Sequence, residues 1–240
     1  MKKIIRSFKS KQDFKPNYLG VLVNPYFITR HNLFKYIKKL STKFIDGKLL
    51  DFGCGSKPYK FLFKVDEYIG LDTYKSGHLH KNENIDVLYD GKKIPFDDNS
   101  FDHIFSSEVL EHVFDINAVM KELNRVLKIN GKILITIPFA WGEHEQPYDF
   151  ARYTSFGLKS ILEKNGFEIV EHIKTANYIE TVFQTLTAYL YHSVVPKGLR
   201  TILTLTLIAP LNILGIFLGK VLPIDKSYYL NNIMLCVKIK

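Results

Sequence analysis

The stretch Leu49-Leu50-Asp51-Phe52-Gly53-Cys54-Gly55 joins a short apolar run to a Gly-x-Gly turn. Residues 48–52 predict a β-strand, and glycines directly after a strand allow a tight turn and a close approach of the backbone to a ligand. In doubly wound α/β sheets this turn lies at the carboxyl edge, where ligands bind. The dinucleotide fingerprint would continue Gly-x-Gly-x-x-Gly, whereas Ser56-Lys57-Pro58 follows here, which counts against a nicotinamide dehydrogenase.

Short apolar runs alternate with helical patterns on both sides of this turn. The helical patterns repeat apolar residues at spacings of three and four, and Asn130-Gly131 is expected to end the second of them. The alternation predicts an α/β fold with a doubly wound, Rossmann-like parallel sheet. The further strands are expected at 68–71, 85–89, 103–106, 133–137 and 167–173, and the helices at 29–44, 116–127 and 156–164.

Acidic residues stand at the ends of several predicted strands. Asp72 closes the second strand, Asp90 closes the third, and Asp102 opens the fourth. An acid at the place of Asp72 can accept hydrogen bonds from ribose hydroxyls. The alternative is that the glycines form only a tight turn and that the acids are ordinary surface residues.

Four segments of the chain, taken in order and at their spacing, resemble class I S-adenosylmethionine-dependent methyltransferases of the type 11 kind. The similarity runs from about residue 47 to residue 173, roughly half of the chain. The segments are LLDFGCGSKPY (49–59), YIGLD (68–72), DVLYDGKKIPFDDNSFDHIFSSEVLEHV (86–113) and ELNRVLKINGKILITIP (122–138).

This resemblance implies a seven-stranded sheet whose last strand is antiparallel, and S-adenosyl-L-methionine as the cofactor. It places Asp72 on the ribose hydroxyls and Asp90 beside the adenine amino group. A sulfonium methyl is already activated, so that alignment of acceptor, methyl and sulfur is the main requirement and no metal is expected. The remaining implied positions are Asp51, Gly53, Cys54 and Gly55 at the methionine moiety, and Ser106, Ser107 and Glu108 around the methyl-transfer pocket.

Residues 141–154, after the fifth strand, are rich in groups that move protons or hold polar ligands. His144 is the best candidate for a general base, since a neutral imidazole can accept a proton near physiological pH. Arg152 could clamp a carboxylate or phosphate, and Asp149 could orient either residue. The alternative is a structural loop in which Asp149 pairs with Arg152 and Thr154 caps the next helix.

Two further resemblances bear on this region. Residues 144–154 resemble the His-x-x-Pro-x-Asp-x-x-Arg-Tyr-Thr pattern of bacterial methyltransferases that accompany surface-polysaccharide and lipid-linked sugar pathways. His112, in Glu111-His112-Val113, is common at the pocket rim of the family and is either catalytic or a packing residue.

The C-terminal third contains an apolar segment, residues 201–219, without a charged residue. Its length suits a membrane span. Residues 233–239, however, predict the final strand of the sheet, and one crossing would place that strand on the far side. Interruptions at Pro210, Asn212 and Gly215 favour two short broken helices that dip into one leaflet and return. A true span and a soluble, buried segment are the alternatives.

The charge of the chain is concentrated at its N-terminus. The net charge is +9, of which residues 1–43 carry +10 and the remainder −1. This basic arm suits an anionic cytoplasmic membrane surface, as do Lys197, Arg200 and Lys220 around the apolar segment. The apolar run of a signal peptide is missing after the basic start, so we expect a cytoplasmic protein, peripheral or monotopic on the inner face of the membrane.

Composition and cysteine content exclude several classes of protein. With 46% hydrophobic and 24% charged residues the chain is globular rather than disordered. Cys54 and Cys236 lack partner cysteines at metal-ligand spacing, which argues against a zinc site built from cysteines and against a disulfide. The domains expected are a basic arm with its helix (1–43), a methyltransferase core (44–174), an apolar helical insertion (175–226) and the final strand (227–240).

The sequence therefore predicts a methyltransferase that modifies an oxygen or nitrogen of a small or lipid-linked acceptor, such as a glycan, at the membrane. An RNA methyltransferase that uses the basic arm is the alternative enzyme, although the arm has no recognised nucleic-acid motif. A catalytically inactive, cofactor-binding subunit is the alternative without an activity.

Overall fold

A computed structural model of the chain describes residues 11–74, 84–194 and 196–240. The first basic residues of the predicted arm, up to Lys9, lie outside the described residues. The chain divides into two compact units. The sheet unit comprises Lys38–Ile173 and Asn232–Lys240, and the helical unit comprises Met1–Ile37 and Lys174–Asn231.

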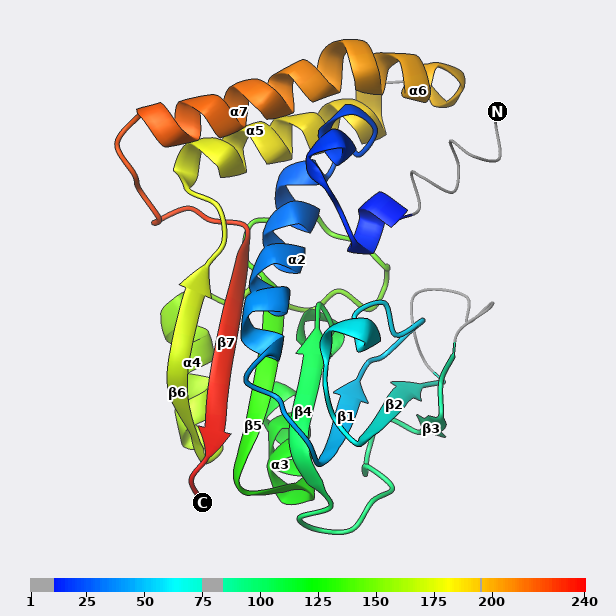
Figure 1. Cartoon of the computed structure of the whole chain (residues 1–240), viewed down its shortest axis with the longest axis vertical. Helices are drawn as coiled ribbons and strands as arrows, with labels where there is room; N and C mark the ends of the chain where they lie inside the picture. Colours follow the sequence, from blue (N-terminus) through cyan, green and yellow to red (C-terminus); the bar gives the residue numbers. More distant parts are fainter. Residues whose placement is uncertain (1–10, 75–83, 195) are drawn as a thin grey trace. The chain divides into compact units, whose positions relative to one another are not determined.

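The sheet has seven strands in the order β3-β2-β1-β4-β5-β7-β6. In Figure 1, β7 runs opposite to β5 and β6, so the last strand is antiparallel, which confirms the predicted fold class. The strands are β1 (Lys48–Phe52), β2 (Glu67–Thr73), β3 (Val87–Tyr89), β4 (Phe101–Ser107), β5 (Leu127–Pro138), β6 (Phe167–Lys174) and β7 (Asn231–Lys238).

Parallel pairing around β1 brings the ends of several strands together. β1 pairs in parallel with β2 and β4, so that Asp51 lies opposite Gly70 on one side and Phe105 on the other. β3 continues the parallel arrangement beyond β2, and β5 continues it beyond β4. Consequently the residues that follow β1, β2, β3, β4 and β5 all emerge at one carboxyl edge.

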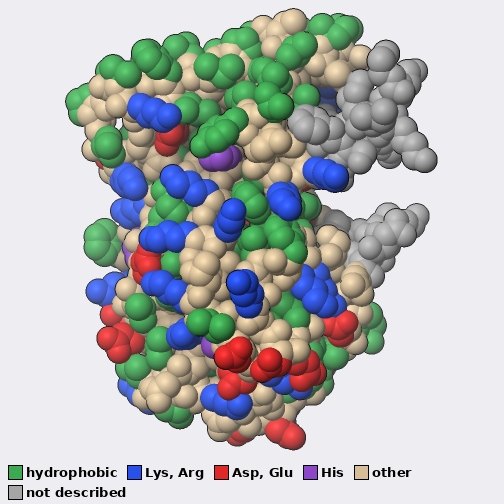
Figure 2. Space-filling model, in the orientation of Figure 1, with side chains coloured by type: hydrophobic (Ala, Val, Ile, Leu, Met, Phe, Trp, Pro, Cys, Tyr) green, Lys and Arg blue, Asp and Glu red, His purple; other side chains and the backbone are tan. Residues whose placement is uncertain are grey.

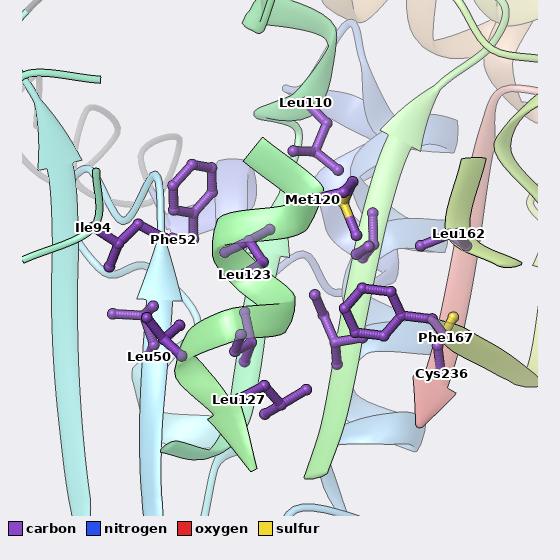
Figure 3. Packing of buried hydrophobic residues seen from close by; sticks show 14 of the residues in the cluster. Leu50, Phe52, Ile94, Leu110, Met120, Leu123, Leu127, Leu162, Phe167 and Cys236 are labelled. Atoms are coloured by element: carbon purple, nitrogen blue, oxygen red, sulfur yellow. The ribbon is translucent and has the colours of Figure 1, made fainter. Parts of the chain in front are cut away.

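Helix α3 (Ile116–Val126) supplies one side of the core. Its N-cap is Asp115, whose side chain accepts a hydrogen bond from the Ala118 N–H at 3.0 Å. Its apolar positions at helical spacing are buried against the strands, and Figure 3 shows Met120 and Leu123 among side chains of β1, β6 and β7. Helix α4 (Ser155–Lys164) contributes Leu158 and Leu162 to the same core.

Two boundaries differ from the sequence-based prediction. Helix α3 ends at Val126, not at Asn130-Gly131, because Leu127 already has extended dihedral angles and pairs with Phe101. Between Leu127 and Lys132 the pairing shifts register, and Asn130 takes a φ of 64° there. The turn residues thus form an irregularity inside β5 rather than a helix end. Helix α2 (Phe27–Ser41) begins two residues earlier than expected and ends at Ser41.

The helical unit contains two helices that pack on each other, α5 (Tyr178–Tyr189) and α7 (Ala209–Val221). Close approach is possible because glycines face the partner helix: a Cβ at Gly215 would lie 2.5 Å from the Cβ of Phe183. The Asn177 amide donates to the Gly219 carbonyl at 2.7 Å. Glycines at the contact therefore let the two helices approach closely, and the Asn177 hydrogen bond joins them.

The apolar segment is one helical run rather than two short broken helices, so that part of the prediction is wrong. α6 (Arg200–Leu203), a π-helical turn (Thr204–Ile208) and α7 follow one another without a break. The π turn lies directly before Pro210, which has no N–H to donate to the preceding turn. Asn212 does not interrupt the helix, because its side chain accepts from the Thr187 hydroxyl at 3.2 Å inside the packed helices.

Within the described part of the chain, one helical run, Lys197–Val221, is long and apolar enough to cross a membrane by length and composition. About a third of its most apolar window is buried.

A substitution at Lys238 on β7 tests whether the final strand belongs to the sheet. Its buried ammonium donates to the carbonyls of Asn124 and Leu127, both at 2.8 Å, and to the Asn99 side chain at 3.2 Å. Lys238→Met removes these charge-assisted hydrogen bonds while keeping the apolar stem. We expect the free energy of unfolding to fall by about 2–3 kcal/mol in denaturant titration. The exposed Lys121→Met in α3 is the control and should change it little; equal effects would contradict the buried position of Lys238.

Candidate active site at the carboxyl edge

The glycine turn after β1 is held by β2 and leaves room beside it. The N–H groups of Gly53 and Cys54 both donate to the Leu71 carbonyl, at 2.9 and 3.1 Å. Gly53 has a φ of +73°, and a Cβ there would lie 2.4 Å from a methyl group of Val109, so glycine is required. Gly55 has a φ of +46°, and a Cβ there would meet no atom within 4 Å. A ligand can therefore approach the backbone at Gly55.

Asp72 lies directly against this turn, as its position at the end of β2 predicts. One carboxylate oxygen accepts from the Gly55 N–H at 2.9 Å, and the other accepts from the Thr73 N–H at 2.8 Å. The side chain is nearly buried, and each oxygen keeps a second lone pair. Cys54, within the turn, is also buried, and burial raises the pKa of its thiol, so that it stays uncharged.

Asp51 is the most deeply buried acid of the turn. Its carboxylate accepts a hydrogen bond from the Tyr68 hydroxyl at 2.7 Å. Burial raises the pKa of Asp51 to about 7; the hydrogen bond from Tyr68 opposes this shift, and the negative charge of Asp72 adds to it. Asp51 can therefore gain or lose a proton near neutral pH.

A buried lysine supports the turn, and the sequence analysis missed it. Lys57 is 6% exposed, and its ammonium lies 2.5 Å from a carboxylate oxygen of Asp86. The same oxygen accepts from the Gly70 N–H at 2.7 Å. Since a Cβ at Gly70 would lie 2.2 Å from the Lys57 side chain, this bridge requires glycine in β2. A lysine two residues after a Gly-x-Gly turn is expected at the surface, so nothing in the sequence predicted that Lys57 is buried.

The two remaining strand-end acids lie in different places. Asp90 follows β3 on an exposed turn, where its carboxylate accepts from the Lys92 N–H at 2.9 Å. Pairing of β3 with β2 brings it to the same edge as Asp72. Asp102 lies at the opposite, amino edge, where it accepts from the Lys48 N–H and pairs with Lys128. A hollow of about 350 Å³ at that edge includes Asp102 but none of the predicted site residues.

Polar side chains continue across the ends of β4 and β5. The hydroxyls of Ser107 and Thr136 lie 2.8 Å apart, and Thr136 donates to the Glu108 carboxylate at 2.8 Å. Glu108 has a φ of +57°, in the left-handed region, and its N–H donates to the Thr136 carbonyl. Ser106 is fully buried, whereas Ser107 and Glu108, at the end of β4, are half-buried.

Residues 141–152, called the acceptor loop below, are organised around an ion pair. Arg152 binds both carboxylate oxygens of Asp149, at 2.6 and 2.7 Å. Burial disfavours the charge on Asp149, but the hydrogen bonds from Arg152 outweigh this and lower its pKa to about 2. Arg152 also donates to the carbonyls of Trp141, Gly142 and Ala151. These contacts match the alternative in which Asp149 and Arg152 pair to form a structural loop. Thr154 caps α4 as expected, because its side chain accepts a hydrogen bond from the Gly157 N–H.

The ion pair positions His144. The His144 N–H donates to Asp149 at 2.8 Å, and the imidazole Nδ1 lies 3.3 Å from the Gly142 carbonyl, from Asp149 and from an Arg152 nitrogen. Burial lowers the pKa of His144, and the neighbouring His112 adds to this effect. A neutral imidazole at physiological pH has a lone pair available, as a proton acceptor or a ligand requires.

His112 lies next to His144, although the two are 32 positions apart in the sequence. Their ring centroids are 4.8 Å apart, with the rings nearly perpendicular. The Nδ1 of His112 lies 2.8 Å from the Tyr148 carbonyl. A carbonyl only accepts, so Nδ1 donates and Nε2 keeps its lone pair. That Nε2 lies 3.7 Å from a carboxylate oxygen of Glu111 and 3.8 Å from one of Glu145.

Glu111 is a second residue whose role the sequence analysis missed. Its side chain is fully buried, and neither carboxylate oxygen has a hydrogen-bond partner among the described residues. Burial raises the pKa of Glu111 well above its usual value, the charge of Glu108 adds to the shift, and Arg152 opposes it. Its backbone carbonyl accepts from the N–H groups of Phe150 and Ala151, which joins the end of β4 to the acceptor loop.

Comparison with known proteins points to one family. Residues 50–135 match a family model described as a methyltransferase domain. An uncharacterized protein of Methanocaldococcus jannaschii is 33% identical over 144 residues, which are 56% of this chain and 61% of that protein. Demethylmenaquinone methyltransferase of Staphylococcus saprophyticus is 32% identical over 115 residues, which are 42% of this chain and 48% of that protein. The chain thus spans less than two thirds of the length of either relative.

A solved structure agrees in fold. Phosphoethanolamine N-methyltransferase 2 of Haemonchus contortus, in complex with S-adenosyl-L-methionine, matches with a TM-score of 0.53 and 17% identity, over 97% of this chain and 60% of that chain. The family match runs from β1 into β5, the strands that carry the glycine turn, Asp72 and the end of β4. These similarities support an S-adenosylmethionine-dependent methyltransferase domain of the class I type at residues 50–135, with S-adenosylmethionine as its cofactor.

Proposed function

We propose that this chain transfers a methyl group from S-adenosylmethionine to an oxygen or nitrogen of a small or lipid-linked acceptor at a membrane surface. The observation that carries the proposal is the contact of Asp72 with the Gly55 N–H beside open space, within a domain that matches methyltransferases. The acceptor and the membrane contact are the parts that go beyond the family assignment.

The groups at the carboxyl edge fit this cofactor. S-adenosylmethionine has a positive sulfonium, an ammonium group and a ribose with two hydroxyls. Among the described residues, each carboxylate oxygen of Asp72 accepts one hydrogen bond, which leaves a lone pair on each for the ribose hydroxyls. Asp51 is a buried acid that a nearby positive charge would keep ionised. The open space at Gly55 admits a ligand, while Asp90 and Glu108 extend the acidic lining of the edge.

The bound cofactor would supply a methyl group that is already activated by the positive sulfur. Methylation of a hydroxyl forms an O–C bond, breaks the C–S bond with its electrons left on sulfur, and releases one proton. The acceptor oxygen is deprotonated, in this proposal, at the cluster of His112, His144 and Glu111. Arg152 and Asp149 act as positioning residues, since they hold the backbone and ring of His144.

A lipid-linked or membrane-dissolved acceptor is supported by three features. The acceptor loop resembles the pattern of methyltransferases that accompany surface-polysaccharide and lipid-linked sugar pathways. One relative is a demethylmenaquinone methyltransferase. The third feature is the helical unit, whose surface suits a bilayer.

That surface combines apolar and basic side chains. In Figure 2, hydrophobic side chains gather over α7 and α5. Lys197, Arg200 and Lys220 border this surface along the chain, and each basic residue near an anionic bilayer contributes about 1 kcal/mol. We propose a monotopic contact with the inner face of the membrane. The exposed apolar residues of the run are Leu199, Ile202, Leu205, Leu207, Ile213, Leu214, Phe217 and Val221.

Asp72→Asn tests the cofactor site. Asparagine offers one acceptor oxygen in place of two and removes the charge, so we expect the Kd for S-adenosylmethionine to rise by about 10- to 100-fold. Isothermal titration calorimetry measures this directly. Asp97→Asn, an exposed acid on a loop of the same unit, is the matched control and should leave the affinity unchanged. An unchanged affinity in Asp72→Asn would refute the assignment of the pocket.

The proton on Asp51 makes cofactor affinity depend on pH. In the free protein its pKa is about 7, and a cation beside it would lower that pKa. Below pH 7 binding must therefore release a proton, so affinity should increase from pH 5.5 to 7 by at most about 10-fold per pH unit and then level off. Calorimetry in buffers of different ionisation enthalpy measures the released proton, which Asp51→Asn should abolish.

Stability of the free protein provides a second readout of Asp51. The pKa of Asp51 is higher in the folded protein than in the unfolded chain. Its contribution to the stability of the folded state is therefore present at about pH 4 and is lost as the pH rises to about 7. Asp51→Asn should consequently have a higher Tm than the unmodified protein at pH 8 and not at pH 4. A lower Tm at pH 8 would show that Asp51 is ionised and stabilising.

Vesicle flotation tests the membrane contact. Protein with intact α7 should float with vesicles that contain anionic phosphatidylglycerol and less with pure phosphatidylcholine. Ile213→Ser together with Phe217→Ser removes apolar area from the exposed face of α7 and should reduce the floating fraction several-fold. Phe156→Ser, which changes an exposed aromatic residue of α4, is the control. Equal flotation of both variants, or none for the unmodified protein, would refute the proposal.

A further inference from the structure

Glu111, His112 and His144 form a compact set of metal-ligand side chains. One ligand atom from each residue lies within 4.8 Å of the others. Glu111 and His112 belong to the single 3-10 turn that follows β4, and His144 belongs to the acceptor loop after β5. All three lie in the sheet unit, on the segments that follow the carboxyl ends of neighbouring strands.

We propose that Glu111, His112 and His144 bind a divalent transition-metal ion of the zinc class. The first reason is the state of Glu111. A fully buried carboxyl group is normally hydrogen-bonded, and leaving it without a partner is costly. Both oxygens of Glu111 lack one among the described residues, and one of them lies 3.7 Å from the Nε2 of His112. A cation between them would compensate the buried charge.

The second reason is the orientation of the two imidazoles. Histidines that bind metals usually donate their other N–H to a carbonyl or carboxylate, which fixes the ring. The Nδ1 of His112 donates to the Tyr148 carbonyl at 2.8 Å. The Nδ1 of His144 lies 3.3 Å from two acceptors, the Gly142 carbonyl and Asp149, and equally far from a donor nitrogen of Arg152. In the tautomer that has its proton on Nδ1, directed at either acceptor, the Nε2 of His144 offers a lone pair to a ligand, as that of His112 does.

The third reason is charge and geometry. Arg152 is close to His144, but its charge is neutralised by the two hydrogen bonds with Asp149. Ligand atoms around tetrahedral zinc are ~3.3 Å apart, whereas those of this set lie within 4.8 Å of one another, so the widest separation needs to shrink by at most about 1.5 Å to close on the ion. Glu145, whose carboxylate lies 3.8 Å from the Nε2 of His112, can complete the set or leave a position for the acceptor. Two imidazoles favour zinc over magnesium.

The role of the metal ion in catalysis rests on the proposed function, whereas metal binding itself does not. A metal ion held by these residues would bind the acceptor hydroxyl and lower its pKa. The proton would then leave to solvent before methyl transfer, and the cluster would act through the metal instead of accepting the proton itself. No electron is transferred. His144 would then be a ligand instead of the general base predicted from the sequence, and the sequence-based expectation that no metal takes part would be revised.

Metal binding is measured without any activity assay. Untagged full-length protein, stripped with a chelator, is dialysed against Zn²⁺, and bound zinc is counted by plasma mass spectrometry. We expect one zinc per chain. Glu111→Gln and His112→Gln should each weaken zinc binding by at least about 10-fold, since even outer partners of metal ligands contribute that much. Co²⁺ in place of zinc should give the visible absorption of a low-coordinate site, lost in both variants.

His172→Gln is the matched control, because His172 lies in the same unit but outside the Glu111, His112 and His144 cluster, and its imidazole is hydrogen-bonded to Asn232. It should retain one zinc with unchanged affinity. Well under one zinc in the unmodified protein, or unchanged binding in both cluster variants, would overturn the proposal. S-adenosylmethionine affinity, measured on the same samples, separates the two claims: zinc binding without cofactor binding refutes the proposed function and leaves the metal site standing.

Discussion

Crowding of carboxylates at the carboxyl edge of the parallel strands is the constraint on which the rest of this site depends. Because β1, β2 and β4 run in register, the acids that end them are brought together away from water. The negative charge of Asp72 raises the pKa of Asp51, and that of Glu108 raises the pKa of Glu111, in each case after burial itself. Such an arrangement costs stability unless a positive group binds there. The cofactor would provide this positive group beside Asp51 and Asp72, and a metal ion would provide it beside Glu108 and Glu111.

Other charged groups near the edge are already paired, and they shape the site instead of taking part in its chemistry. Lys57 and Asp86 connect the glycine turn to β2 through the Gly70 N–H. Asp149 and Arg152 fix the acceptor loop and with it the ring of His144. Among the described residues, the acids that form an ion pair with Lys57 or Arg152 are therefore supporting residues, whereas Asp51, Asp72 and Glu111, which form none with a lysine or arginine, are the candidates for ligand binding.

The sequence predicted the sheet well because its signals are local. β1 matches residue for residue, and the final strand, expected at 233–239, is observed at Asn231–Lys238. The end of α3 was wrongly predicted from Asn130-Gly131, because turn residues can also lie inside an irregular strand. The apolar run was expected to break at Asn212 and Gly215, but both residues serve tertiary contacts of α7. Glu111 was missed because it is joined to a loop some forty residues away, a long-range contact that no local pattern encodes.

The central claim is that the buried acids beside the glycine turn bind S-adenosylmethionine. A crystal structure with S-adenosylhomocysteine, the product that the methyl transfer leaves, tests it most directly. We predict density for the ligand beside Gly55, with the ribose hydroxyls within hydrogen-bond distance of Asp72 and the sulfur facing the segment from Glu108 to His112. Ligand density at another position, or a ribose that makes no contact with Asp72, would contradict the account.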